Sequence, residues 1–536
     1  MAAKNVCRGS SVMEAARDIA GQPGREEAFY ILDVEEVVRR LKLWRQLLPR
    51  VELFYAVKCN NDPGLLEALV ALGAGFDCAS KAELEQVLGL GAHPRRIIFA
   101  NPYKAPSHIR RAQELNVPLM TFDSVSELHK VKAIYPEAQL VLRIRSDATE
   151  AIVRLGLKFG ALPEETRELL VAARTLSLNI VGVAFHVGSG CRESTAYTRA
   201  ITAARKVFDE AEEEGFKPYL LNIGGGFPGQ DDVLLTKHAD CINKALNHFF
   251  PDDGRVKVIS EPGRYVATKC FTLVTTIIGK RRVVVEGQVH PTSNCQGQVH
   301  PTSNSQGQVH PTSNCQGQVH PTSNSQGQVH PTSNSQGQVH PTSNSQGQVH
   351  PTSNSQGQVH PTSNSQGQVH PTSNSQGQVH PTSNSQGQVG VQVSGPPTTS
   401  GQEQTGTQES DHPATVMYYI NEGTYSSFAL TRTHFVPDPP TPLEVRGETP
   451  VKPSIVWGRS CCGNDRVTKK VFLLPDLQLG DWLMWPNMGA YCFTLSTHFN
   501  GFPLTEVHVV ASSDTVDYME GKMRSRQNQS PLPDHQ

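Results

Sequence analysis

The stretch ELFYAVKCNNDPGLLEALVALGAGFDCASKAELEQVLGLG, residues 52–91, sets the pattern of the fold. It begins with an apolar run at 52–57, continues into an amphipathic segment at 63–72, and repeats this pair at 75–78 and 81–91. Short apolar runs that alternate with amphipathic segments are typical of parallel strands joined by crossover helices. The stretch therefore predicts two consecutive strand–helix units of an α/β fold.

The same alternation extends in both directions and fills residues 27–270. Nine strands are predicted there, at 29–32, 52–57, 75–78, 97–99, 119–122, 140–144, 181–187, 219–223 and 256–260. About eight strand–helix units in one domain favour a closed (β/α)8 barrel over an open sheet. Active sites of such barrels lie on the loops after the strands, so polar residues at the strand ends are the candidates for a site.

A second sequence pattern, short predicted strands between Pro, Gly and Asn turns, follows later in the chain. Strands predicted at 418–421, 454–457, 481–484 and 507–510 indicate a mostly β domain. Two further runs, 273–278 and 283–285, come before a long insertion and are expected to belong to it. We therefore assign 271–286 and 414–536, including a polar C-terminal tail, to one β-domain, together with the N-terminal segment 1–26.

The insertion consists of ten tandem copies of the unit GQVHPTSNSQ over 287–386, and Cys295 and Cys315 replace a serine in two of them. Each unit offers one apolar side chain, a valine, which is too little to offset the entropy of ordering the chain. The array is therefore predicted to be disordered, as is the Gly/Gln/Thr/Ser/Pro-rich linker 387–413. A weak metal-binding or pH-sensitive histidine tract is the alternative, although neither a defined ligand geometry nor second-shell support is visible.

Composition excludes several classes of protein. The 536 residues carry a net charge of −2 without a long basic run, which argues against a nucleic-acid binder. No stretch approaches the roughly 18 apolar residues of a membrane span, and residues 1–25 lack the apolar core of a secretory signal. The nine cysteines outside the array follow no zinc-binding spacing, so no metal is expected and a reducing, cytoplasmic location is predicted.

The segment Phe54-Tyr-Ala-Val-Lys58-Cys-Asn60 places a lysine at the end of a buried strand. A lysine in an apolar run must extend to solvent, pair with a charge or perform chemistry. Desolvation lowers the basicity of an amine and suits it to Schiff-base formation. Taken alone, a lysine that simply reaches solvent is the simpler interpretation.

Three further strand ends carry polar or glycine-rich motifs. Asn222-Ile-Gly224-Gly225-Gly226-Phe-Pro-Gly229 can close its backbone N–H groups around a phosphate, although tight turns explain most glycine runs. Ser260-Glu261-Pro-Gly-Arg264 offers an anion partner and a carboxylate that could hold a pyridinium N–H, or else a surface salt bridge. His186 and Ser189 follow another strand, where the imidazole could stack on a planar cofactor or serve a structural role.

Together these motifs resemble eukaryotic ornithine decarboxylase and its relatives, over 27–286 and again over 415–512. The resemblance implies an alanine-racemase-like, pyridoxal-phosphate-binding (β/α)8 barrel with a β-sandwich domain interrupted by the array, in a homodimer with shared active sites. It implies that His186 lies on the cofactor ring and that Cys461 delivers a catalytic proton from the neighbouring subunit. The implied cofactor-binding set is Lys58, Asp77, Arg143, His186, Ser189, Gly224, Gly225, Gly226, Glu261, Arg264 and Tyr491, and the implied substrate pocket contains Tyr425 and Phe499.

The match fails at two aspartates with which ornithine decarboxylases bind the distal ammonium of their substrate. One of these positions is Cys462, and the other, counted without a gap, falls on His434. An ammonium buried without its counter-charge costs several kcal/mol. We therefore expect a pyridoxal-phosphate-dependent amino-acid decarboxylase that prefers a neutral or apolar L-amino acid, such as leucine, to ornithine.

Two alternatives remain open at the level of sequence. The chain could be an ornithine decarboxylase proper, acting in putrescine and polyamine synthesis, or a catalytically silent protein similar to the antizyme inhibitors. The complete cofactor set favours an enzyme, because a silent relative is free to lose it. Antizyme binding stays open, although residues 116–140 carry only Lys130 and Lys132 as lysines and therefore lack a dense basic face.

Overall fold

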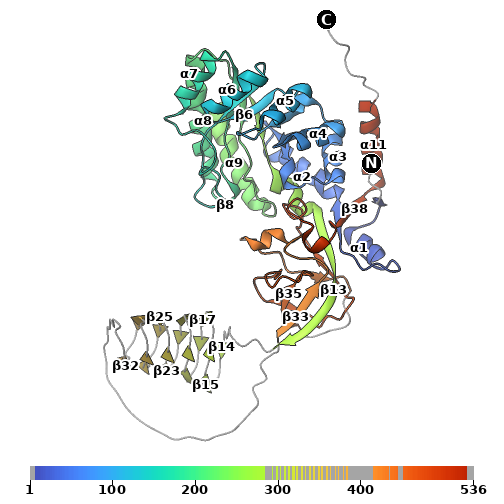
Figure 1. Cartoon of the computed structure of the whole chain (residues 1–536), viewed down its shortest axis with the longest axis vertical. Coiled ribbons are helices and arrows are strands. Elements are labelled where there is room, and N and C mark those ends of the chain that lie inside the picture. The colour runs from blue at the N-terminus through green and yellow to red at the C-terminus, as the bar shows by residue number, and fades with distance from the viewer. Residues whose placement is uncertain are drawn as a thin grey trace. The chain divides into compact units, whose positions relative to one another are not determined.

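In the computed structural model the described residues are 6–283, 415–433, 435–444 and 451–527, together with short strands inside the tandem array. They divide into two compact units, Met1–Arg281 with Val416–Gln536, and Arg282–Thr415. The first unit contains a closed barrel and a mixed sheet (Figure 1).

Eight parallel strands close into the barrel that the alternation predicted. Its closure is made by β12 and β3, where Val258 pairs with Val51. The strands are β3 (Val51–Ala56), β4 (Gly75–Cys78), β5 (Ile97–Phe99), β6 (Leu119–Phe122), β7 (Gln139–Arg143), β9 (Asn179–Ala184), β11 (Leu220–Asn222) and β12 (Lys257–Ser260).

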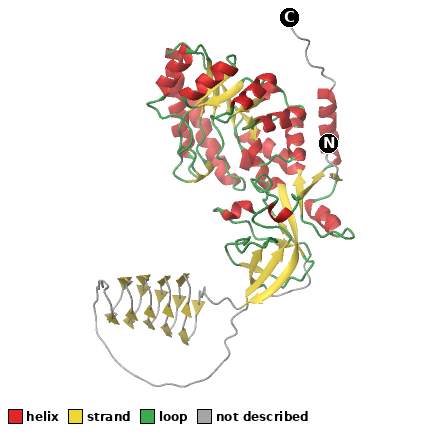
Figure 2. Cartoon of the chain, viewed as in Figure 1, coloured by secondary structure: helices red, strands yellow, loops and turns green. Residues whose placement is uncertain are grey.

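Helices form the layer outside these strands (Figure 2). Local sequence signals mark where such helices begin. Before α3 (Pro63–Ala71), Asp62 accepts a hydrogen bond from the Leu65 N–H (3.0 Å), and Pro63 occupies the first turn. The helices are α2 (Val34–Leu47), α3 (Pro63–Ala71), α4 (Lys81–Gly89), α5 (Pro106–Glu114), α6 (Val125–Ile134), α7 (Thr166–Thr175), α8 (Thr195–Glu213), α9 (Asp232–Phe249) and α10 (Gly263–Ala267).

The middle of the barrel is packed with apolar side chains. Seven buried residues from six of its strands form one cluster: Phe54, Ile98, Val141, Val181, Ala184, Leu220 and Ile259. Because this cluster fills the interior, the barrel is no pore, and chemistry is restricted to the loops at the strand ends.

The second part of this unit is a nine-stranded mixed sheet that branches at β13. Its main path runs β1, β38, β2, β13, β33, β35, β36, while β37 pairs with both β13 and β34. These strands are β1 (Val6–Arg8), β2 (Phe29–Asp33), β13 (Phe271–Val283), β33 (Thr415–Ile420), β34 (Thr441–Pro442), β35 (Lys452–Trp457), β36 (Phe472–Leu474), β37 (Trp482–Trp485) and β38 (Glu506–Ala511). The expected combination of a (β/α)8 barrel and a C-terminal β-domain is confirmed.

One predicted strand belongs to the other domain. The run 29–32 was assigned to the barrel region 27–270, but β2 pairs with β13 on one side and with β38 on the other. An apolar run of four residues carries no information about its partner strands, one of which lies at 271–283 and the other at 506–511. Likewise, β13 is one strand through Val283, where two separate runs were predicted.

The described residues of the second unit are two- and three-residue strands within the repeats. Equivalent strands twenty residues apart pair in parallel, as at Thr292 and Thr312. In-register stacking of identical units pairs backbone groups without a large core. The predicted disorder of 287–386 as a whole stays a prediction. The other repeat residues and the linker 387–413 lie outside the described residues.

Two short helices flank the sheet strands of the first unit. α1 (Val12–Ala20) begins at Ser11 with a capping box to Glu14. α11 (Ser513–Gln527) occupies most of the predicted polar tail. None of the helices in the described ranges combines the length and apolar character needed to cross a bilayer.

Candidate active site

The predicted site residues follow the C-terminal ends of the barrel strands. Lys58 lies one turn beyond β3, Asp77 within β4, Arg143 at the end of β7, His186 just after β9, and Glu261 directly after β12. Since all eight strands are parallel, these ends meet at one face of the barrel. The strand pattern alone therefore places the residues near one another.

Lys58 and Asp77 form an ion pair at this face, with Nζ bonded to Oδ2. Asp77 is fully buried, whereas the lysine side chain is 44% exposed to the cavity that it lines. Desolvation lowers the pKa of Lys58, but the negative charges of Asp77 and Glu261 outweigh it and leave that pKa above its usual value. The carboxylate thus holds the amine in place as an ammonium.

Glu261 lies across the same cavity and accepts a hydrogen bond from Asn222 Nδ2 (2.6 Å). Burial and the neighbouring charge of Asp77 raise the pKa of Glu261 to about 7, against the opposing effect of Lys58. The carboxyl is therefore close to balance between its two protonation states at neutral pH. A cationic N–H placed beside it would favour the ionised form.

The glycine run 224–226 packs against the turn that carries His186. A Cβ on Gly224 would overlap the Phe185 carbonyl, and one on Gly225 would lie 2.8 Å from His186 Nε2. Gly224 and Gly226 also have positive φ angles, +62° and +113°. Side chains are therefore excluded from this loop, which leaves its backbone open toward the cavity.

His186 is a neutral imidazole at this face. Its Nδ1 accepts a hydrogen bond from the Gly188 N–H (3.0 Å), which fixes the ring. Burial, followed by the positive charges of Arg143 and Lys58, lowers the pKa of His186 well below its ordinary value. Its Nδ1 is thus an acceptor, and the ring adds no positive charge to the cavity.

Arg264, Ser189 and Tyr491 form the cationic end of the cavity. Arg264 Nε donates to Ser189 Oγ (2.9 Å), and the guanidinium lies 4.6 Å from the centre of the Tyr491 ring. The Tyr491 N–H donates to the Cys59 carbonyl (2.8 Å), which ties this ring to the turn carrying Lys58. A guanidinium beside a hydroxyl and a glycine loop is suited to an anionic group.

Arg143 completes the cluster. Burial lowers the pKa of its guanidinium, while Glu261, Asp123 and Asp77 act in the opposite direction, so it lies within electrostatic reach of the carboxylates of the site. Seven of the eleven residues of the expected cofactor set line one cavity, namely Lys58, His186, Ser189, Gly226, Glu261, Arg264 and Tyr491. Asp77 bonds Lys58, and Gly224 and Gly225 pack against His186. Sequence reasoning missed Asn222, which bonds both Glu261 and the Gly224 N–H (2.9 Å); its place directly before the glycine run was the available signal.

A second cluster contains the expected proton donor and substrate pocket. Cys462 Sγ lies 3.0 Å from the Tyr425 hydroxyl, and the rings of Tyr425 and Phe499 stack with centroids 4.1 Å apart. Cys461 is exposed, 3.6 Å from Asn500 Oδ1. None of these four predicted residues lines the Lys58 cavity among the described parts of one chain.

The fourth predicted pocket residue, His434, lies outside the described residues. Both cysteines and the Tyr425 turn belong to the β-domain, whereas Lys58 belongs to the barrel. The segment from Tyr491 to Phe499 connects the two clusters, since the Thr497 N–H donates to the Tyr425 carbonyl (3.0 Å).

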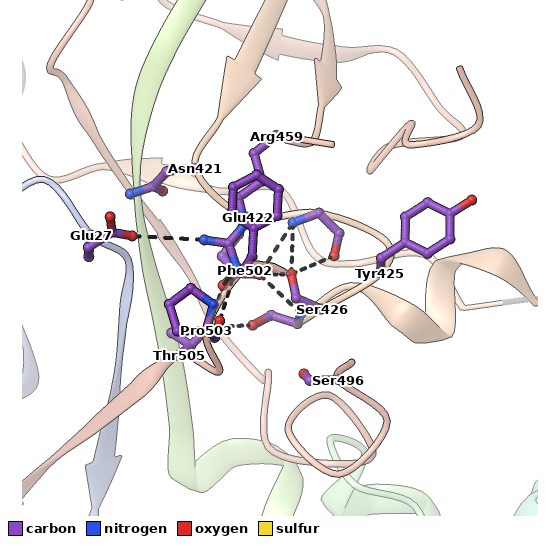
Figure 3. A network of polar contacts seen from close by, with 12 residues as sticks. Glu27, Asn421, Glu422, Tyr425, Ser426, Arg459, Ser496, Phe502, Pro503 and Thr505 are labelled. Atoms are coloured by element: carbon purple, nitrogen blue, oxygen red, sulfur yellow. Dashed lines mark hydrogen bonds and ion pairs between the residues drawn. The ribbon is translucent and has the colours of Figure 1, made fainter. Parts of the chain in front are cut away.

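A buried ion pair lies beside the turn that carries Tyr425 (Figure 3). Glu422 is 1% exposed, and its Oε2 accepts a hydrogen bond from the Ser426 hydroxyl. Its Oε1 accepts one from the Thr505 hydroxyl and lies 3.4 Å from Arg459 Nη2. Arg459 also lies 4.3 Å above the Phe502 ring. These contacts tie the turn that carries Tyr425 to the strand end that precedes Cys461.

Asp465 connects the two loops directly. Its buried carboxylate accepts hydrogen bonds from the Thr424 N–H (2.6 Å) and hydroxyl (3.0 Å), and from the Ser460 N–H (2.9 Å). A Cβ at Gly423 would lie 2.6 Å from this carboxylate, so the loop approaches closely because it has no side chain there. Sequence reasoning missed this residue, since its partners appear only after folding.

Replacing Asp465 with asparagine is expected to lower the free energy of unfolding by ~1–3 kcal/mol, because the amide turns one acceptor into a donor that faces backbone donors. Urea denaturation of purified protein measures this change. Asp476→Asn is the matched control, since Asp476 pairs with lysines at 17% and 30% exposure and a loss below ~1 kcal/mol is expected there. Equal losses in both variants would contradict a special role for Asp465.

Comparisons with known proteins agree with this architecture. Residues 34–268 match the model of the pyridoxal-dependent decarboxylase pyridoxal-binding domain, and 369–489 match the C-terminal sheet domain of the same decarboxylases. The chain is 33% identical to rat ornithine decarboxylase over 515 residues, covering 94% of this chain and 87% of the relative. It is 34% identical to antizyme inhibitor 2 of Xenopus laevis over 500 residues, covering 93% and 84%.

Solved structures of other decarboxylases have a similar fold. The arginine decarboxylase of Paramecium bursaria Chlorella virus, bound to agmatine, is 29% identical with a TM-score of 0.66, covering 93% of this chain and all of that one. The lysine decarboxylase of Selenomonas ruminantium is 26% identical with a TM-score of 0.61, covering 94% and 97%.

Proposed function

The chain belongs to the ornithine decarboxylase family of pyridoxal-dependent decarboxylases, and from that premise we propose that it decarboxylates a neutral, apolar L-amino acid such as leucine. It is a carboxy-lyase with pyridoxal phosphate as cofactor. The observation that carries the substrate proposal is the thiol of Cys462, hydrogen-bonded to Tyr425 beside a stacked aromatic pair.

The residues around the Lys58 cavity fit this cofactor. An amine at one side can bind the aldehyde, and Arg264 with Ser189 and the glycine loop can hold the phosphate. Glu261 can accept the pyridine N–H, which would draw its pKa of about 7 downward. Asp77 Oδ1, buried and without a partner in the described chain, is a further acceptor for this end of the site.

When bound, pyridoxal phosphate supplies the electron sink that stabilises the carbanion left by loss of carbon dioxide. Glu261, held in position by Asn222, would accept the N–H of the cofactor ring. Lys58, held by Asp77, would be the amine that carries the cofactor aldehyde and that the substrate amine replaces. The imidazole of His186 would add no positive charge to the site.

The proton for the carbanion would come from Cys461 of a second subunit. Within one chain Cys461 is exposed and belongs to the Tyr425 cluster rather than to the Lys58 cavity, which supports a homodimer with shared sites. The nine described cysteines are free thiols, which is in keeping with a reducing, cytoplasmic location.

The polarity of the second cluster favours an apolar substrate side chain. A thiol is a weak acceptor, and even as a thiolate it offers a distal ammonium one soft atom in place of two carboxylate oxygens. The stacked rings of Tyr425 and Phe499 add apolar surface. A site that lacks the polar partner of a substrate group can lose about 10⁴-fold in discrimination, so ornithine and lysine should be poor substrates.

The test is carbon dioxide release from leucine and from ornithine, measured side by side at equal concentration on the purified, cofactor-loaded protein. We expect leucine to be turned over faster, with a larger kcat/KM. Valine, methionine and lysine complete the panel and locate the preferred size and charge. Faster turnover of ornithine than of any neutral amino acid would overturn the substrate proposal and leave an ornithine decarboxylase.

A second candidate is a silent binding protein, which the 34% identity to antizyme inhibitor 2 favours. The gathered cofactor set argues for the enzyme, because a protein without catalysis has no need for Lys58, Glu261 and Arg264 around one cavity. The absorbance band of the lysine-bound cofactor distinguishes the two candidates. Protein purified with added cofactor that lacked this band would support the silent candidate, with antizyme as the partner to test.

A further inference from the structure

Two thiols stand next to each other at the second cluster. Cys461 is exposed and Cys462 is half-buried. The other described cysteines lie deeper or elsewhere: five are buried, Cys59, Cys78, Cys191, Cys270 and Cys492, and two are half-buried, Cys7 and Cys241. The described chain thus offers one adjacent, solvent-accessible pair of thiols.

The surroundings distinguish this pair chemically as well. Burial raises the pKa of Cys59 and of Cys492 to about 12, which leaves these thiols protonated and inert. Hydrogen bonds from the Tyr425 hydroxyl and the Asn464 backbone lower the pKa of Cys462 below its ordinary value. Since the thiolate is the reactive form, oxidants should reach Cys462 before the buried cysteines.

The two thiols differ in how firmly they are held: Cys462 Sγ lies 3.0 Å from the Tyr425 hydroxyl, whereas Cys461 is held only weakly. The Sγ of Cys461 is 3.6 Å from Asn500 Oδ1, which is a weak contact. A Cβ added to the next residue, Gly463, would meet no atom within 4 Å, so the loop has free space on this side. The Cys461 side chain can therefore turn toward Cys462, which gives up its hydrogen bond to Tyr425 when the two sulfurs join.

We propose that Cys461 and Cys462 are a redox-sensitive pair that a peroxide converts to a reversible disulfide, which switches the enzyme off. The Cys462 thiolate attacks one oxygen of hydrogen peroxide, so an S–O bond forms, the O–O bond breaks, and hydroxide leaves to become water. The Cys461 thiol then attacks that sulfur, an S–S bond forms, and the second oxygen leaves as water with the thiol proton. The two sulfurs lose two electrons, and the peroxide gains them.

A disulfide between two cysteines that are neighbours in the chain is also easy to reduce. Their Cα atoms are about 3.8 Å apart across a trans peptide, below the 4.4–6.8 Å usual for disulfides, so the ring is strained. Strained and exposed disulfides have higher reduction potentials and are the labile ones. Cellular dithiols can therefore restore the pair.

The consequence for activity rests on the proposed function, in which Cys461 delivers the proton and Cys462 lines the substrate pocket. A disulfide removes both thiols together, while the Lys58 cluster, which shares no residue with the pair, keeps its cofactor. Loss of a general acid costs about 10²–10⁴-fold in turnover. Oxidation should therefore abolish turnover without releasing cofactor.

The experiment treats the cofactor-loaded full chain with a small excess of hydrogen peroxide, blocks free thiols, and digests it with trypsin without reductant. Cleavage after Arg459 and Arg466 gives SCCGNDR, a peptide that holds both cysteines and no other. We expect this peptide to lose about 2 Da, in step with the loss of activity. Dithiothreitol should restore both, and the absorbance of the lysine-bound cofactor should not change.

Two variants complete the test. Cys462→Ser is expected to give no 2 Da loss, and its remaining thiol should add oxygen in a form that dithiothreitol reverses only in part. Cys241→Ser, which removes a half-buried thiol on α9, should respond as the wild type does. Activity lost while SCCGNDR stays reduced, or gains only oxygen, would overturn the proposal. The mass change remains measurable if no substrate is found, so a failure of the proposed function is recognised separately.

Discussion

Replacing Lys58 with alanine is expected to lower the decarboxylation of the best substrate by about 10²–10⁴-fold. The amine is held at the cavity by Asp77, and no other lysine lines that cavity among the described residues. Without it, covalent attachment of the cofactor and its exchange with the substrate lose their nucleophile. Carbon dioxide release and the absorbance of the lysine-bound cofactor should fall together.

Lys257→Ala is the matched control for this variant. Lys257 begins β12, at the opposite end of a barrel strand, and pairs with Glu52 at 3.0 Å and 39% exposure. An exposed pair of this kind contributes little to stability, so turnover should stay within about twofold of the wild type. A similar loss in both variants would show that the effect of Lys58→Ala is not specific to the cavity.

Mixing two inactive proteins tests the shared site. Lys58→Ala and Cys461→Ala subunits, dissociated and reassociated in equal amounts, should give mixed dimers in about half of the cases, each with one site built from two intact halves. About a quarter of the wild-type activity should then return. Mixtures that stay inactive after proven exchange of subunits would contradict a site built from two chains.

Cys462→Asp is expected to raise kcat/KM for ornithine by about tenfold or more, because a carboxylate hydrogen-bonds an ammonium better than a thiol does. The same change should lower kcat/KM for leucine, since it places a charge beside the stacked rings of Tyr425 and Phe499. Recovery should be partial, because position 434 carries histidine instead of the second expected aspartate. Parallel carbon dioxide assays with both substrates measure the switch.

Cys462→Asn provides the control of the same shape without the charge. It should lose leucine activity without the gain on ornithine. If asparagine and aspartate improved ornithine turnover equally, selectivity would depend on hydrogen bonding or size at this position rather than on charge. Faster leucine turnover by the aspartate variant than by the wild type would place the selective contact elsewhere.

The barrel could be predicted from sequence because each strand–helix pair is a local pattern, repeated from β3 to β12. The strand Phe29–Asp33 was misplaced because its four apolar residues, at 29–32, fit a barrel or a sheet equally well. Its partners, Val274 and Val507 among them, lie hundreds of residues away. The pairing of β13 through Val283 depends on similarly distant residues.

The candidate site was likewise predictable where its signal is local in sequence, and not where it depends on contacts made after folding. Motifs at strand ends named Lys58 and Glu261, because unusual residues stood out in apolar or glycine-rich surroundings. Asn222 and Asp465 were missed because their importance lies in which atoms they contact after folding: a carboxylate for one, and two separate loops for the other. The catalytic roles remain predictions for the variants above.

The neighbouring positions of β13 and β33 have an evolutionary consequence. The array begins after one of these strands and ends before the other, and contacts such as the bond from the Thr276 N–H to Asn421 Oδ1 (3.0 Å) hold the two exits close. For a flexible connection between fixed ends, doubling the length costs only about 0.6 kcal/mol in closure entropy. Replication slippage that adds or deletes whole ten-residue units should therefore cost folding little, and chains that differ in repeat number are expected to keep the same barrel and sheet.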